Sequence, residues 1–356
     1  MPQEIGVWAK AKRLSYINQL ALEEGFQAEG VEYFTFPSVC FRGGQNVLKG
    51  KSFDQVWVQV VHSPLDEEFL EQIRQLAPVR VAIVEESLEH TEEEFAQWPA
   101  LRGREEKVRQ RLPFFTHAIA NDERDAKVLN SESMPTFWWP FAIPQKQIIF
   151  SDAIDFQAPV IFSGDVYAKR EKWVNDPMLK KYFVYFPPVD GSLYPSLFNL
   201  THFFCLAFLK LNLPFKESFL RGVYSPSLSF VRKKILRGWL MGLRRGSAVV
   251  NLPSVFKGYT TRVLESMAAG RPVIAWEIPH RPLSNALFEK GKEILTFEED
   301  QPEQLIQHIQ HLKADAFFAQ RMIRNARRKI EAFHTVEKRV RDFLSWLDSG
   351  KLPTYS

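Results

Sequence analysis

Short apolar runs and helical patterns alternate along this chain of 356 residues. Residues 248–252 and 272–276 are continuous apolar runs, a pattern typical of strands that are buried on both faces of a sheet. Between them a helical pattern covers residues 259–269 and stops at Gly270. A helix between two such strands is the crossover of a parallel sheet, so residues 246–276 predict a strand–helix–strand unit.

The same alternation predicts strands and helices on both sides of this unit. The predicted strands are residues 5–9, 56–61, 79–84, 117–120, 160–163, 182–186 and 219–224. The predicted helices are residues 12–24, 65–76, 91–111, one that ends near residue 129, 226–236, 302–312, 316–333 and an amphipathic one from Val336 onward. Residues 134–144, with three prolines, are predicted to form a turn. Repeated strand–helix alternation predicts an α/β protein with doubly wound parallel sheets.

Length and composition fit a globular protein of two domains. The chain exceeds the usual size of one domain, and 45% hydrophobic with 25% charged residues suffices for a core in each half. The net charge of +4 is well below that of a dedicated nucleic-acid binder and suits a polyanionic ligand or an anionic membrane surface. Cys40 and Cys205 give neither a disulfide framework nor a metal spacing, which favours a reducing cytoplasm.

Three stretches bear on membrane contact. Residues 1–5 lack the basic flank and apolar core of a signal peptide. Residues 193–213 are rich in Leu and Phe but include His202 and Lys210, so we expect a buried helix, with contact to a membrane interface as the alternative. One face of the helix at residues 316–333 carries Arg321, Arg324 and Arg328. That face is either solvated or attracted to anionic lipid at the inner side of a membrane.

The loop after the first strand of the crossover is where the pattern places a ligand. Ligands of open α/β sheets bind at the carboxyl ends of strands, so residues 253–260 are the expected site. This loop leads into a helix start that offers Gly258 and the hydroxyls of Tyr259, Thr260 and Thr261. Free amides and the positive end of the helix dipole favour an anion there.

Arg262 and Glu265 lie three residues apart near this helix start and share one face. One interpretation is a surface ion pair, which would contribute only a few tenths of a kcal/mol. The other is a ligand site, in which the carboxylate accepts hydrogen bonds from a ribose diol and the arginine neutralises phosphate.

A second basic turn follows the predicted strand at residues 160–163. It contains Gly164, Lys169 and Arg170. Basic residues on a solvated loop are ordinary, but this turn also lies at a carboxyl strand end. Arg170 is the stronger candidate for an anion, because a planar guanidinium binds two phosphate oxygens at once.

A family resemblance adds to this interpretation. Residues 259–275, YTTRVLESMAAGRPVIA, resemble the nucleotide-binding segment of two-domain glycosyltransferases, closest to the group-one and spore-maturation-type families. Residues 287–295 resemble the element that follows in those families. The resemblance implies the GT-B architecture, two Rossmann-like doubly wound domains that face a cleft. It also implies that Glu265 binds the donor ribose, and that the helix start and the turn ending at Arg170 bind the donor diphosphate.

The resemblance also suggests limits for the domains. Residues 1–145 would form an acceptor-side Rossmann-like domain, and residues 158–335 would form the nucleotide-sugar-binding one. Residues 336–350 would be a helix that returns to the first domain. A nucleotide base would stack near residues 187–189, at the end of the strand predicted at 182–186.

Lys257 departs from the family pattern. Group-one enzymes often carry an acid eight residues before the ribose-binding glutamate, where it contacts the donor sugar, and this position is Lys257 here. The sugar and the stereochemical outcome therefore do not follow from the resemblance.

Sugar transfer requires stabilisation of the departing diphosphate. Lys169, Arg170, Lys257, Arg262 and the amides of residues 258–261 can supply it electrostatically. The sequence shows no Asp/His cluster with metal-ligand spacing. We therefore expect a metal-independent reaction and no cofactor besides the nucleoside-diphosphate sugar, which is the donor substrate.

An inverting reaction also needs a general base on the acceptor side. The residues that follow first-domain strands and qualify are His62, Glu85, Glu86 and Asp122. We prefer His62 because an imidazole titrates near neutrality, although a structural role is an equally simple account of it. We expect His117 and His202 to pack in the core and His280 to line the cleft.

Three hypotheses of different classes remain at this point. The preferred one is a cytoplasmic glycosyltransferase with a glycan, lipid-linked or protein acceptor. A non-catalytic sugar-nucleotide or glycan-binding module is the second, motivated by Lys257. A nucleic-acid-modifying glucosyltransferase is the third, and it predicts a strongly salt-dependent affinity for duplex.

Overall fold

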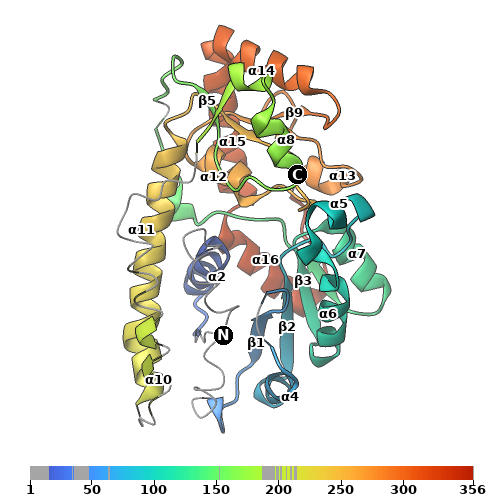
Figure 1. Ribbon diagram of the computed structural model, residues 1–356. Helices are drawn as coiled ribbons and strands as arrows, with labels where there is room; N and C mark the ends of the chain where they lie inside the picture. The colour runs from blue at the N-terminus through green and yellow to red at the C-terminus, as the bar shows by residue number, and fades with distance from the viewer. Residues whose placement is uncertain are drawn as a thin grey trace.

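The computed structural model describes residues 16–33, 35, 48–62, 65–151, 153–186, 197, 200, 203–205, 207–208, 211 and 215–355. The predicted strand at residues 5–9, the predicted base-stacking residues 187–189, Cys40 and His202 lie outside these residues. Two parallel sheets with helices around them form the lower right and the top of Figure 1.

The first sheet has four parallel strands in the order β1-β2-β3-β4. They are β1 (Gln55–Gln59), β2 (Val79–Val84), β3 (His117–Ala120) and β4 (Thr136–Trp138). The connecting helices are α4 (Glu67–Leu76), α5 (Glu92–Gln97), α6 (Arg104–Arg111) and α7 (Glu123–Ser131). Most of β3 and half of β2 are buried, and the apolar runs located both strands correctly.

The second sheet has five parallel strands in the order β6-β5-β7-β8-β9. They are β5 (Val160–Phe162), β6 (Phe183–Tyr185), β7 (Val249–Asn251), β8 (Val273–Trp276) and β9 (Leu295–Phe297). Its helices include α8 (Lys169–Asn175), α12 (Thr261–Ala268), α13 (Pro282–Asn285), α14 (Pro302–Ala314) and α15 (Ala316–Phe333). The unit β7–α12–β8 confirms the predicted crossover.

Three predictions of local structure were wrong. The described residues of 193–213 are mostly exposed, Phe203 by 52% and Phe204 by 58%, so they do not form the buried helix that we expected. Residues 219–224 are helical: α10 (Lys216–Phe219), a π-helical turn (Leu220–Tyr224) and α11 (Ser225–Leu243) follow one another without a break. The buried residues Leu220 and Tyr224 are four apart, so they face inward from a helix, which the short apolar window did not reveal. Residues 134–144 contain β4, an edge strand, and prolines are tolerated beside it because it pairs on one side only.

The strand order creates a switch point in the second sheet. Consecutive connections leave β5 toward β6 on one side and β7 toward β8 on the other. In open α/β sheets the crevice between two such strands, at their carboxyl ends, is the usual ligand site. Here it lies between the loops that follow β5 and β7.

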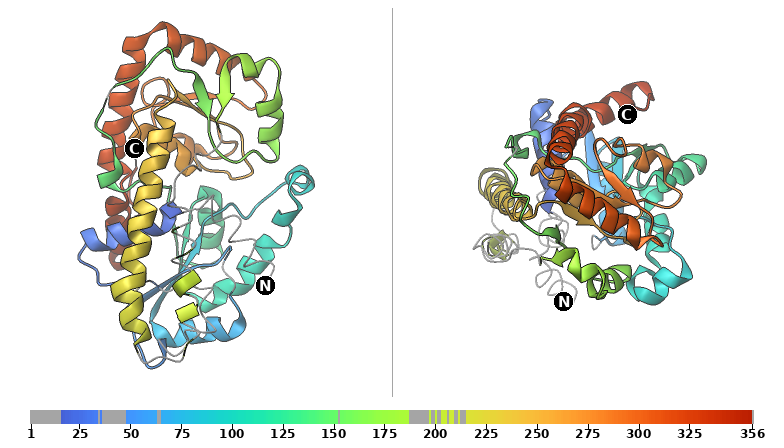
Figure 2. Two further views of the ribbon diagram at one scale, coloured as in Figure 1. Left: turned by 60° about the vertical axis from the view of Figure 1, so that its left-hand side comes forward. Right: turned by 90° about the horizontal axis from the view of Figure 1, so that it is seen from above.

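Two helices connect the parts of the chain. Phe343 of α16 (Val336–Ser349) lies against Trp57, Phe137 and Trp139 of the first domain, with ring centroids 4.6–6.2 Å apart. Helix α2 (Tyr16–Ala28) packs between α16 and α11, and α11 runs alongside both sheets (Figures 1 and 2). The domain limits given above stay a prediction, which the position of the two sheets supports. Among the described helices, none combines the length and apolar character that a membrane span requires.

Candidate functional site

Two buried arginines converge at the switch point. Gly164 follows β5 with a φ of +146°, and a Cβ there would lie 1.8 Å from Nη2 of Arg262. Glycine is therefore what allows the guanidinium to lie against this backbone. The Phe162 ring lies 4.8 Å from the Arg262 guanidinium carbon and 5.8 Å from that of Arg170. We call Arg170 and Arg262 the arginine pair.

The arginine pair is poorly compensated. Nη1 of Arg170 donates to the Asp165 carbonyl (3.2 Å), but neither guanidinium forms an ion pair with a carboxylate of the described residues. Burial, and next the charge of Arg170, lower the pKa of Arg262 to about 9. Burial also lowers the pKa of Arg170. Two desolvated cations side by side favour an anion between them.

The start of α12 leaves its first amides without a side-chain cap. Thr260 is the N-cap residue, but its hydroxyl donates to Oδ1 of Asn251 (2.9 Å) rather than accepting from the helix. The same Asn251 oxygen accepts from Nη1 of Arg262 (3.1 Å). One amide side chain at the end of β7 thus fixes both Thr260 and Arg262, and the helix amides add positive character at this point.

Glu265 is buried one turn further along α12. The indole Nε1 of Trp239 donates to its Oε2 (2.7 Å). Burial raises the pKa of Glu265 to about 7, although the hydrogen bond from Trp239 and the charge of Arg262 oppose the shift. Arg262 and Glu265 do not form the surface ion pair that their spacing allowed, because both side chains point into the protein and find other partners.

Four other predicted site residues lie near the arginine pair in the chain or at a neighbouring strand end, and the first three have mainly structural contacts. Tyr259 is buried with its ring 6.0 Å from that of Phe288, and burial raises the pKa of its hydroxyl. Gly258 lies against the ring of Phe256, which a Cβ would approach to 2.9 Å. Lys169 pairs with Glu299 (2.9 Å) at the carboxyl end of β9. Thr261, the first residue of α12, is half-buried beside Glu265.

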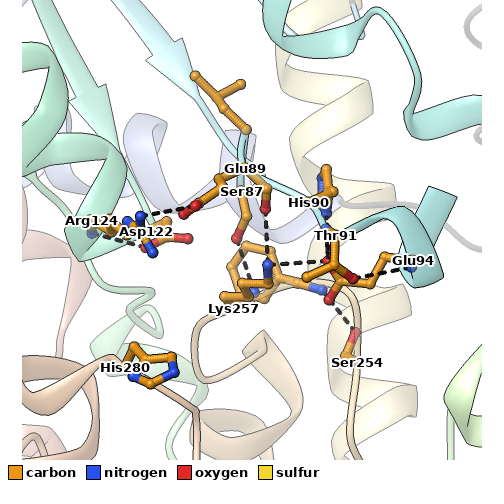
Figure 3. A network of polar contacts seen from close by, with 12 residues as sticks. Ser87, Glu89, His90, Thr91, Glu94, Asp122, Arg124, Ser254, Lys257 and His280 are labelled. Atoms are coloured by element: carbon orange, nitrogen blue, oxygen red, sulfur yellow. Dashed lines mark hydrogen bonds and ion pairs between the residues drawn. The ribbon is translucent and has the colours of Figure 1, made fainter.

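Lys257 reaches across to the first domain (Figure 3). Its Nζ donates to the Glu89 carbonyl (3.0 Å) and pairs with Oε2 of Glu94 (3.1 Å), and its backbone amide donates to the Ser87 hydroxyl (2.9 Å). Burial raises the pKa of Glu94, but the contact with His90, the Thr91 amide and the charge of Lys257 outweigh it and lower the pKa to about 2. The loops after β2 and β7 therefore touch, so the carboxyl ends of the two sheets face each other.

A second interdomain contact was not predicted. Arg281 and Asp122 form a buried two-bonded ion pair, with Nη2 and Oδ2 2.9 Å apart. The neighbouring Glu123 carboxylate accepts from the backbone amides of Leu283 (3.1 Å) and Ser284 at the start of α13. Asp122 was a candidate base because it follows a predicted strand. The order of residues along the chain does not show that Arg281 lies beside it.

Part of the chain matches a known family, and its fold resembles that of solved structures. The glycosyl transferase-like family matches residues 240–345, which include Lys257, Arg262 and Glu265. Among solved structures, sucrose-phosphate synthase from Thermosynechococcus elongatus is 13% identical with a TM-score of 0.51, over 83% of this chain and 73% of the synthase. The protein has the GT-B fold of glycosyltransferases. No curated protein sequence matches the chain significantly.

Two further GT-B structures align with the chain. TarM is 14% identical with a TM-score of 0.55, over 87% of this chain and 58% of TarM, and an S. aureus TarM variant aligns equally well. The pneumococcal O-GlcNAc transferase GtfA is 12% identical with a TM-score of 0.53, over 87% of this chain and 59% of GtfA. At these identities the similarity establishes the GT-B fold, and this chain spans less than two thirds of TarM and GtfA.

The first domain of this GT-B protein presents one exposed histidine at its carboxyl edge. Nε2 of His62, just after β1, lies 2.9 Å from Oε1 of Glu86, and Arg104 pairs with the other oxygen of Glu86. Burial raises the pKa of Glu86, but His62 and Arg104 lower it overall. Glu85 is buried and accepts from Gln59. His117 is half-buried with its ring 5.7 Å from that of Trp346, in agreement with the predicted packing role.

A cavity of about 1250 Å³ lies beside the cleft. Loops after β8 and β9 form most of its wall, with His280, Arg281, Glu298 and Glu299 among the lining residues, and Glu93 of the first domain completes it. His280 therefore lines a cavity next to the interdomain contacts, as predicted. Within the described part of the chain, no three His, Cys, Asp or Glu side chains group as a metal site would require.

Proposed function

We propose that the protein is a glycosyltransferase that moves a sugar from a nucleoside-diphosphate sugar to a glycan, lipid-linked or protein acceptor. The observation that carries the proposal is the arginine pair: two buried guanidiniums at the switch point, without carboxylate partners among the described residues. A diphosphate placed between β5 and β7 would compensate both charges and reach the free amides of α12. The family match over residues 240–345 and the GT-B fold support this assignment.

We further propose the roles of the donor-site residues. The acceptor oxygen attacks the anomeric carbon, the bond from that carbon to the diphosphate oxygen breaks, and its electron pair stays on the diphosphate. Arg170, Arg262 and the α12 amides stabilise this charge, which makes the reaction metal-independent. Glu265 accepts hydrogen bonds from the ribose diol, with Trp239 orienting its carboxylate.

For an inverting reaction we propose His62 as the base that takes the acceptor proton. The side chain is exposed at the carboxyl edge of the first sheet, and Glu86 orients its ring and stabilises the imidazolium that forms. Asp122 is a poor base because its carboxylate is held by Arg281. Glu85 is buried, which leaves it as the second choice.

A binding assay and a turnover assay test the proposal. Because TarM and GtfA have been solved with UDP, calorimetry starts with UDP and GDP, with uridine and guanosine as matched ligands that lack phosphate. We expect either UDP or GDP to bind at least 100-fold more tightly than its nucleoside. We also expect the corresponding nucleotide sugar to release the nucleoside diphosphate at a rate that EDTA does not change. Equal affinity for nucleoside and diphosphate would refute the donor site.

Lys257 supports a second candidate, a non-catalytic sugar-nucleotide or glycan-binding module. Its ammonium is held by Glu94 and the Glu89 carbonyl of the first domain, at the position where group-one enzymes often contact the donor sugar. Tight diphosphate binding with no transfer from any of a panel of nucleotide sugars would favour this module over the enzyme.

We place the protein in the cytoplasm. The buried Cys205 is a free thiol, which suits a reducing compartment. Cell fractionation tests this location, and recovery of the protein from the periplasm or the medium would refute it.

A further inference from the structure

Helix α11 and its flanks carry an unusual share of the positive charge. Residues 216–245 contain eight Lys or Arg and one Glu, a net +7 within a chain whose total is +4. Some of these cations are paired, as Lys233 is with Glu24 (3.0 Å). Lys234, Arg237 and Arg245 form no ion pair with any residue that the structure describes.

Apolar side chains lie exposed among these cations. Val223, Phe230 and Met241 are 52%, 56% and 50% exposed, although each is a residue type that is usually buried. Phe230, Lys234, Arg237 and Met241 of α11 are spaced three or four residues apart, so these side chains share one face of the helix, and Arg245 follows two residues after its end. Figures 1 and 2 show α11 on the flank of the molecule. The guanidinium carbon of Arg245 lies 5.5 Å from the centroid of the Phe186 ring.

At the C-terminal end of this face lies a cavity of about 500 Å³, which we call the arginine pocket. It is lined by Gly238, Met241, Gly242, Arg244, Arg245 and Arg271. Backbone carbonyls hold the inner two arginines: Arg244 donates to Ser151 and Ala269, and Arg271 donates to Ala153, Gly270 and Arg244. The pocket is thus a built site with fixed guanidiniums.

Charge in the arginine pocket is uncompensated by the described residues. Arg271 is 3% exposed, and its Nε meets no hydrogen-bond acceptor among them. Burial, and next the charge of Arg244, lower the pKa of Arg271 to about 10. Burial and the charges of Arg327 and Arg237 lower the pKa of Arg244. A bound anion would relieve this repulsion.

The arginine pocket lies at the opposite edge of the sheet from the donor site. Arg244 and Arg245 precede β7 and Arg271 precedes β8, whereas Arg170 and Arg262 lie at carboxyl strand ends. Phe150, next to the pocket, is 68% exposed, and its ring lies 5.8 Å from the guanidinium carbon of Arg327. Arg327 and Arg244 both donate hydrogen bonds to the Ser151 carbonyl. Arginines beside exposed aromatic and aliphatic side chains are the combination found at lipid interfaces.

We propose that the arginine pocket and the outer face of α11 form a docking surface for an anionic membrane. The pocket takes the phosphate of a lipid headgroup, and Phe150, Phe230 and Met241 enter the interface. The excess of positive charge on this face is complementary to an anionic leaflet. The inference concerns a separate surface and does not depend on the proposed function.

Vesicle co-sedimentation tests the charge contribution. Vesicles of phosphatidylcholine with about a third phosphatidylglycerol are compared with phosphatidylcholine alone, for the wild type, Arg245→Glu and Arg321→Glu. Arg321 is an exposed arginine of α15, on the face that sequence analysis offered as the alternative lipid contact. We expect binding to the anionic vesicles only, and a partition coefficient reduced about tenfold or more by Arg245→Glu but less than twofold by Arg321→Glu.

The same assay tests the apolar contribution. Phe230→Ser should weaken binding severalfold, whereas Phe317→Ser, at an 84% exposed position on α15, should leave it unchanged. Absence of binding to anionic vesicles, or equal losses for Arg245→Glu and Arg321→Glu, would overturn the proposal.

Inorganic phosphate distinguishes a free anion from a headgroup. We expect any rise of the melting temperature in phosphate, relative to chloride of equal ionic strength, to be the same for the wild type and Arg245→Glu, because the arginine pair is intact in both. A rise that Arg245→Glu abolishes, without vesicle binding, would show that the pocket holds a soluble phosphate and that the membrane assignment is wrong.

Discussion

The second sheet carries arginines at both of its edges, and the two sets differ in what holds them. At the amino edge, Arg244 and Arg271 donate to several backbone carbonyls each, so they stabilise the fold and present charge as a consequence. At the carboxyl edge, Arg170 donates to one backbone carbonyl and Arg262 donates to the side chain of Asn251, and neither has a carboxylate partner among the described residues. The difference supports the proposal that the arginine pair binds a ligand rather than stabilising the fold.

The largest expected effect is that of Arg262→Met. The substitution removes a guanidinium that would bind the departing diphosphate, so diphosphate release from the donor should fall by about 10²–10³-fold. Stability should be unchanged or higher, because only one hydrogen bond to Asn251 is lost while a desolvated charge disappears. A turnover assay measures the loss of activity, and urea unfolding measures the change in stability. Arg324→Met, on the exposed face of α15, is the control for both. A large loss of stability would place Arg262 with the structural arginines.

Arg271→Met should show the opposite behaviour. Three carbonyls, that of buried Gly270 and the partly buried ones of Ala153 and Arg244, would lose their donor at about 1 kcal/mol each, so the free energy of unfolding should fall by up to about 3 kcal/mol. Urea unfolding of this variant beside Arg262→Met compares the two edges directly. If Arg271→Met and Arg262→Met had equal free energies of unfolding, the proposed difference between the arginines of the two edges would be wrong.

Gly164→Ala should disturb the arginine pair without removing a charge. The new Cβ would overlap Nη2 of Arg262, so the guanidinium must move and diphosphate affinity should fall by about tenfold. Gly291→Ala is the control, because Gly291 also has a positive φ but nothing within 4 Å of an added Cβ. If calorimetry showed the same affinity for both variants, Gly164 would not be needed to position Arg262.

The smallest effect concerns pH. Glu265 has a pKa raised to about 7, so its ionised fraction rises from about a tenth at pH 6 to about nine tenths at pH 8. Only the carboxylate accepts two hydrogen bonds from a ribose diol, so diphosphate affinity should rise up to about ninefold over this range. In Glu265→Gln the affinity should rise less with pH. Any pH dependence that remains comes from ionisation of the ligand. An identical profile in both proteins would exclude Glu265 from the site.

Local pattern was sufficient for most elements, and the donor residues that it suggested stay a prediction. The continuous apolar strands β7 and β8 are buried throughout, so their apolar runs identify them. Residues 219–224 were misassigned because six apolar-rich residues fit a strand and a helix equally well until Leu220 and Tyr224 are seen to face the same core. The edge strand β4 was missed because its flanking prolines resemble a turn.

By itself, the sequence determined the crossover, the GT-B resemblance and the identity of Arg170, Arg262 and Glu265 as donor-site candidates, since these depend on residues close together in the chain. Only the tertiary structure decided the partners: Trp239 for Glu265, Glu94 for Lys257, and Arg281 for Asp122. Each of these contacts joins segments at least 26 residues apart in the chain, and burial then sets how strongly each charge feels the other. The arginine pocket likewise became visible only when β7 and β8 brought Arg244 and Arg271 together.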